Sequence, residues 1–112
     1  MTADTITAPP AEDLADDLSI STDLQAGRVT VTGDLERISA HHLLDAVRGL
    51  ALSDQRIWSV DAGGITFCDV EGLRVLARAR SLAESHGRTL ELAHARPFLT
   101  RLLLLSGYPH GH

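Results

Sequence analysis

The chain has 112 residues, of which 44% are hydrophobic, and it carries a formal net charge of −5. These values suit one small domain with one core and argue against wholesale disorder. No apolar run approaches the roughly 20 residues that span a bilayer, and the acidic balance argues against nucleic acid, which calls for a basic stripe. The chain begins without the basic and apolar regions of a secretory signal. The single cysteine, Cys68, cannot form an internal disulfide, which is compatible with a reducing cytosol. From these features together we expect a cytoplasmic protein without membrane insertion.

The first part of the chain indicates a disordered acidic tail over residues 1–16, since no hydrophobic period is sustained there. Five acids lie near the start of the chain, before any basic residue: Asp4, Glu12, Asp13, Asp16 and Asp17. A folded domain is expected over residues 17–108, followed by a short tail over residues 109–112.

Two segments that alternate apolar and polar residues, 18–22 and 28–32, predict a pair of strands. Ala26-Gly27 supplies a turn between them, which predicts a hairpin.

A helix is expected next, over residues 39–52, because apolar residues recur there at helical spacing. Ser39 has the position of its N-cap, and Ile38 and Leu43 have the spacing of a hydrophobic staple.

An apolar strand over residues 56–60 then leads through a tight glycine-containing loop, 61–64, toward Asp69, which has the position of a helix N-cap. The helix is expected to run from near Val70 to a close at Gly87. Its buried stripe would consist of Gly72, Val75, Leu76, Ala79, Leu82 and Ala83. Free N–H groups and the positive end of the helix dipole meet at the helix start, which suits an anion or a regulatory phosphate.

A strand over residues 89–93 and a helix over residues 97–106, started by a proline and ended by a glycine, complete the pattern. Leu103 or Leu104 is expected to be partly exposed and to mark a contact patch. The order β-β-α-β-α-β-α implies parallel crossovers after an antiparallel pair. We therefore expect an α/β fold, with a small mixed four-stranded sheet and helices packed on it.

The segment Asp69-Val70-Glu71-Gly72-Leu73 resembles the central motif of STAS domains, the fold of bacterial anti-sigma factor antagonists. In that family the loop has roughly the sequence Asp-Ser-(Ser/Thr)-Gly-Leu. With the same element order, the resemblance covers about residues 18–108. It implies a cytoplasmic protein that binds a kinase-like anti-sigma factor and so frees a sigma factor, and whose loop serine is phosphorylated to block that binding.

Val70 and Glu71 occupy the positions of the two hydroxyl residues, and neither accepts phosphate, so no phosphoacceptor is expected. Glu71 has two interpretations. It is either a partial mimic of phosphate, with one charge instead of nearly two, or a first-turn acid that favours the helix dipole by ~0.3–1 kcal/mol.

The expected function is a non-enzymatic protein–protein interaction module, without the serine phosphoswitch, whose partner is an anti-sigma factor with a kinase-like ATP-binding domain. Homodimerisation stays open. The expected partner-binding residues are Gly63, Gly64, Asp69, Val70, Glu71, Gly72, Arg74 and Arg78. The alternatives are a STAS scaffold or regulatory subunit of a transporter ATPase or stress-signalling complex, and a small nucleotide-binding protein or enzyme.

No catalytic residue, cofactor or metal ion is expected, because no Ser-His-Asp order, metal motif or phosphate loop stands out. His41 and His42 lie in the first turn of a helix, where adjacent positions point apart, so a shared metal ion is not expected. His110 and His112 fall in the tail. Cys68 lies beside a helix start, where a thiol pKa can fall, but without a paired His or a second Cys it is expected to be a small buried residue.

Overall fold

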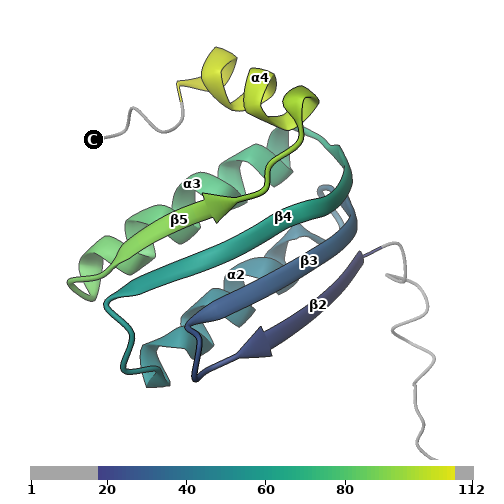
Figure 1. Ribbon diagram of the computed structural model, residues 1–112. Coiled ribbons are helices and arrows are strands. Elements are labelled where there is room, and N and C mark those ends of the chain that lie inside the picture. The colour runs from purple at the N-terminus through teal and green to yellow at the C-terminus, as the bar shows by residue number, and fades with distance from the viewer. Residues whose placement is uncertain (1–17, 108–112) are drawn as a thin grey trace, which may run out of the picture.

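The computed structural model describes residues 18–107, which form one sheet with helices packed on it (Figure 1). The strands are β2 (Leu18–Asp23), β3 (Arg28–Leu35), β4 (Ile57–Cys68) and β5 (Thr89–Ala93), in the spatial order β2-β3-β4-β5. β2 and β3 pair antiparallel, whereas β4 pairs parallel with both β3 and β5. The predicted mixed four-stranded sheet is therefore confirmed. The tails expected over residues 1–16 and 109–112 lie outside the described residues.

The helices of the described region are α2 (Ala40–Gly49), α3 (Val70–Ser85) and α4 (Pro97–Ser106), with a short 3₁₀ turn, η1 (Leu50–Leu52), after α2. α2 and α3 lie side by side behind the sheet in Figure 1. Their apolar stripes and the inward-facing strand residues form the core, in which Trp58 and Leu76 are fully buried. None of the described helices is long and apolar enough to cross a bilayer.

Both ends of α3 are formed as the sequence predicts. At the start, Asp69 Oδ1 accepts a hydrogen bond of 2.8 Å from the Gly72 N–H. At the end, Gly87 has a φ of +73°, and the Arg88 N–H donates to the Ala83 carbonyl oxygen at 2.8 Å. A left-handed glycine with this backbone bond satisfies carbonyl groups that a helix end leaves unpaired.

The start of α2 differs from the prediction. Ser39 does not cap the helix, because its Oγ donates to the Asp34 carbonyl oxygen at 3.1 Å and accepts no bond from the first turn. Ile38 is 67% exposed, so the expected staple with the buried Leu43 does not form. The cause is a turn closed by the Ser39 N–H and the Glu36 carbonyl oxygen, 3.0 Å apart, which directs Ile38 outward.

β4 is longer than predicted, because the segment 61–64 is not a loop but part of one strand of 12 residues. Two register shifts in its pairing with β3 place the additional residues in β-bulges. At the first bulge, the Gly63 N–H donates to Asp61 Oδ1 at 3.0 Å, and the Gly63 carbonyl oxygen accepts from Arg96 Nε at 3.0 Å. These contacts satisfy backbone groups that have no partner in the sheet ladder, so the strand continues.

Candidate partner-docking site

The candidate site lies where β4 ends and α3 begins, and Asp69 is its centre. Asp69 Oδ2 accepts a hydrogen bond of 3.0 Å from the Arg37 N–H, while Oδ1 accepts from Gly72. The Asp69 N–H donates to the Leu35 carbonyl oxygen at 3.2 Å. The predicted capping role of Asp69 is confirmed, and the carboxylate also holds the turn before α2 against the start of α3.

Gly72 sets the distance between α3 and the end of β3. A Cβ atom at this position would lie 2.8 Å from Cys68 Sγ and would overlap the Leu35 carbonyl oxygen. Only glycine therefore fits without a shift of the backbone. The prediction that Gly72 lets the helix approach the sheet is confirmed.

Three large apolar side chains are exposed around this helix start. Ile38 is 67% exposed, Phe67 48% and Val70 61%, and each lies within two positions of Arg37 or Asp69. The sequence predicted a contact role for Val70 alone. Nothing in the pattern marks Ile38 or Phe67, because their exposure follows from the turn before α2 and from the bulges in β4. We name Ile38, Phe67 and Val70 the apolar docking patch.

Glu71 and Arg74 form an ion pair on the first turn of α3, with Glu71 Oε2 and Arg74 Nη1 2.6 Å apart. The guanidinium offsets part of the charge that the carboxylate presents, within the limits of an exposed pair. Glu71 is therefore a poorer mimic of phosphate than its position in the motif suggests, and its interaction with the helix dipole remains.

The nearest hydroxyl before the motif belongs to Thr66, at the end of β4. Its Oγ1 donates to Asp34 Oδ1 at 3.0 Å. Residues 67–72 contain no hydroxyl group. The hydrogen bond to Asp34 gives Thr66 a structural role at the strand end.

The structure brings most, but not all, of the predicted partner-binding residues together. Gly64 lies five positions before Asp69 along an extended strand, a distance of about 16 Å. A Cβ on Gly64 would lie 2.8 Å from Thr32 Oγ1, so this glycine serves a close backbone approach. Arg78 is exposed, two turns along α3 from Val70.

A second polar cluster, which the sequence did not indicate, surrounds Gly63. His94 Nδ1 lies 3.3 Å from Asp61 Oδ1, and His94 itself has a φ of 60°. The hydrogen bond from the Gly63 N–H, followed by His94 and Arg28, lowers the pKa of Asp61 against the opposing effect of burial. The cluster stabilises the bulge of β4.

A groove of about 460 Å³ runs from Val70, the one member of the docking patch that lines it, between α3 and the end of α4. Val70, Leu73 and Ala77 contribute apolar surface, while Arg74 and Glu84 contribute charge. In α4, Leu103 is buried, whereas Leu104 is 60% exposed and Leu105 is 80% exposed. Of the two leucines named in the prediction, Leu104 is therefore the exposed one, and Leu105 is exposed as well.

Cys68 is buried, with 6% of its surface exposed. Burial, with a smaller contribution from the Asp69 charge, raises the pKa of its thiol to about 12. The thiol therefore stays protonated at neutral pH and makes a poor nucleophile. The interpretation of Cys68 as a small buried residue is confirmed.

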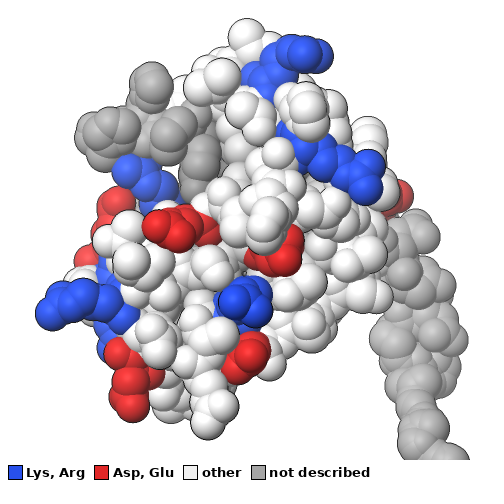
Figure 2. Space-filling view, in the orientation of Figure 1, with Lys and Arg blue, Asp and Glu red and all other residues white. Residues whose placement is uncertain are grey.

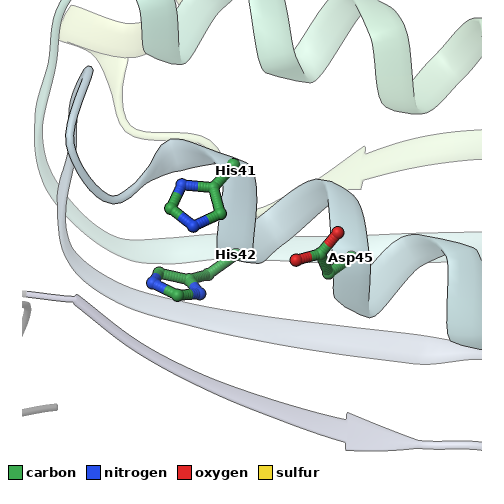
Figure 3. Close-up of side chains that lie close together, drawn as sticks. All are labelled: His41, His42 and Asp45. Atoms are coloured by element: carbon green, nitrogen blue, oxygen red, sulfur yellow. The ribbon is translucent and has the colours of Figure 1, made fainter. Parts of the chain in front are cut away.

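The adjacent histidines of α2 do not point apart as expected. Figure 3 shows the rings of His41 and His42 side by side, with their centroids 4.0 Å apart, and Asp45 follows on the next turn. At a helix start no preceding turn restricts the side-chain torsions, so both rings can turn to the same side. We name His41, His42 and Asp45 the α2 histidine cluster.

Charges of both signs are interspersed on the face seen in Figure 2, around a broad uncharged area. The described residues on this face form no continuous basic stripe of the kind that tracks a phosphate backbone.

A mixed four-stranded sheet, with adjacent helices on one face and a capped helix start among exposed apolar side chains, defines a small α/β domain. Residues 18–110 match the family model described as "Mlab, STAS domain", and the chain belongs to this STAS family. The resemblance noted in the central motif is therefore confirmed. STAS domains are in general regulatory or protein-interaction modules without catalysis. Comparison with curated protein sequences gives no match.

Among the solved structures that match this chain, two illustrate the shared fold. The murine anion transporter solute carrier family 26 member A9, in its inward-facing state, matches with a TM-score of 0.61 and 21% identity, over 72% of this chain and 14% of that chain. A structure described as Mglu matches with a TM-score of 0.52 and 18% identity, over 69% of this chain and 19% of that one. The chain thus corresponds to less than a fifth of either protein, and these likenesses concern the fold alone.

Proposed function

We propose that the protein is a non-enzymatic, cytoplasmic docking module that presents the start of α3 to a partner protein, as an anti-sigma factor antagonist does, but without a serine phosphoswitch. The observation that supports this most is the exposure of Ile38, Phe67 and Val70 around a helix start fixed by Asp69. Exposed apolar side chains on a rigid backbone are typical of protein-binding surfaces.

The partner in this proposal is an anti-sigma factor with a kinase-like ATP-binding domain. Val70 and the other patch residues would enter an apolar pocket of the partner, and Arg74 and Arg78 would set the orientation by charge. Because the motif has no hydroxyl between Phe67 and Gly72, binding would not be ended by phosphorylation of this loop. Control would come from the abundance of the proteins or from a competing partner.

A second candidate is a regulatory subunit that docks onto a transporter ATPase. It is suggested by the occurrence of the same fold as a part of an anion transporter. In both proposed functions the partner would bind the start of α3. Neither function requires a phosphoacceptor in the motif, so the sequence of the motif is compatible with both.

Affinity capture from a native extract, with the full chain as bait, distinguishes the two candidates by the partner that it recovers. Affinity for that partner is then measured by titration calorimetry. Val70→Asp places a charge in the docking patch and should weaken binding by ~1–2 kcal/mol, as central interface changes commonly do.

The matched control is Leu52→Asp, because Leu52 is also an exposed apolar residue, at 79%, but lies in η1, before β4 begins. It should leave the affinity unchanged. Equal affinity of wild type and Val70→Asp, with native circular dichroism, would move the interface away from α3. Mass spectrometry after incubation with the partner and ATP should find no phosphate on residues 66–72.

A further inference from the structure

The α2 histidine cluster has no part in the proposed function, and its geometry points to a different kind of ligand. His41, His42 and Asp45 are all exposed, and each offers one ligand atom. These three atoms lie within 4.8 Å of one another. It is the one group of at least three such side chains found among residues 18–107.

We propose that this cluster binds a transition-metal ion of the zinc type through two imidazole nitrogens and one carboxylate oxygen. Zinc bonds to these atoms at about 2.0–2.2 Å, so two of its ligands in tetrahedral geometry lie about 3.3–3.5 Å apart. Because no two of the ligand atoms are more than 4.8 Å apart, a shift of at most about 1.5 Å brings them to this spacing. Rotation of exposed side chains between rotamers provides such a shift. Imidazole nitrogen selects zinc, copper or nickel over magnesium and calcium, which prefer oxygen.

The helix supplies the arrangement of the ligands. Asp45 follows His41 by four positions and His42 by three, and both spacings place side chains on the same surface of a helix. The usual objection to adjacent histidines is that their rings diverge, and here the ring centroids are only 4.0 Å apart. Three protein ligands leave one position open for water or for a side chain of another protein.

Arg48 competes with the metal ion for Asp45. Its Nη1 lies 3.0 Å from Asp45 Oδ1, and both side chains are more than half exposed. An exposed pair of this kind is weak, so a divalent ion bound by two imidazoles displaces the guanidinium or uses the other carboxylate oxygen. Arg48→Ala should therefore strengthen metal binding.

The test is titration calorimetry of the full chain with zinc chloride, in a His110→Ala, His112→Ala background that removes the histidines of the C-terminal tail. One saturable site is expected. His41→Ala and His42→Ala should each weaken zinc binding by at least about tenfold, since loss of even an outer-shell partner costs about 10–100-fold. Asp45→Asn should weaken it less, because the amide keeps an oxygen that can still coordinate the ion although the negative charge is lost.

The matched control is His94→Ala, because His94 is another exposed histidine beside a carboxylate, that of Asp61, but has only this one companion. It should leave the zinc affinity unchanged. The proposal is overturned if the background protein shows no saturable zinc binding. It is also overturned if His41→Ala and His42→Ala, with native circular dichroism, bind zinc as tightly as the background does, or if His94→Ala abolishes binding.

Discussion

Asp69 and Arg37 are joined by a hydrogen bond of 3.0 Å from the Arg37 N–H to Asp69 Oδ2, although 32 positions separate them in the sequence. The other carboxylate oxygen caps α3 through Gly72. One side chain thus fixes both the first turn of a helix and the turn that carries Ile38. The docking patch depends on this double contact, because its members lie on the two segments that Asp69 holds together.

Replacement of Asp69 should loosen both segments. Asp69→Ala removes the cap and the acceptor for Arg37, and should lower the free energy of unfolding by about 1–2 kcal/mol, as loss of an N-cap does. Asp69→Asn keeps one carbonyl oxygen and should cost less. Urea denaturation of wild type and the two variants gives the values, and an equal cost for both substitutions would show that the one oxygen retained in Asn stabilises neither segment.

Gly72→Ala should destabilise the protein by about 1–3 kcal/mol, because the added Cβ meets Cys68 Sγ and the Leu35 carbonyl oxygen in a filled space. Gly49 provides the matched control, since it is also helical and a Cβ there would meet nothing within 4 Å. Gly49→Ala should raise stability by about 0.4–1 kcal/mol. Thermal melts of both variants measure the contrast, and a stabilising Gly72→Ala would mean that α3 can move outward at little cost.

Glu71→Ser should lower stability by less than about 1 kcal/mol, through loss of a favourable interaction with the helix dipole and of the exposed pair with Arg74. Affinity for the partner should hardly change. Titration calorimetry beside thermal melts separates this from two other outcomes. A tenfold gain in affinity would identify Glu71 as a phosphate mimic, and a loss would identify a salt bridge to the partner.

The Cys68 thiol should make stability fall in alkaline solution. Its pKa is about 12 in the folded protein and about 8.5 in an unfolded chain. Between these values the folded state holds more protons, so the free energy of unfolding falls as pH rises above about 8.5. Urea denaturation of wild type and Cys68→Ala at pH 7.5 and pH 10 should show a smaller loss for the variant. A thiol reagent should also react slowly with the native protein and rapidly with the unfolded one.

Features of the fold that depend on neighbouring residues could be predicted from the sequence. The cap at Asp69, the left-handed Gly87 and the proline that begins α4 each act within a few positions, so their residue types indicate their roles. The strand and helix order follows from hydrophobic periodicity for the same reason.

Features that depend on distant residues could not be predicted. The segment 61–64 resembles a loop, but Arg96, which binds the Gly63 carbonyl oxygen from 33 positions away, lets it remain in β4. Ser39 has the residue type of an N-cap, yet its hydroxyl donates a hydrogen bond to the Asp34 carbonyl oxygen in β3 instead. At the site, Val70 and Asp69 were predicted from the motif, whereas the exposure of Ile38 and Phe67 depends on the turn before α2 and on the bulges in β4, which the residue pattern does not mark.

The position of β4 between two parallel neighbours has a consequence for the thermodynamics of recognition. Because β4 is paired on both sides over its first residues and continues beside β3 to Cys68, the backbone that leads to α3 has little freedom left to lose. A partner that contacts Val70 would meet a surface already in its bound shape. Association would then lose little conformational entropy, and even a small apolar patch could give a measurable affinity.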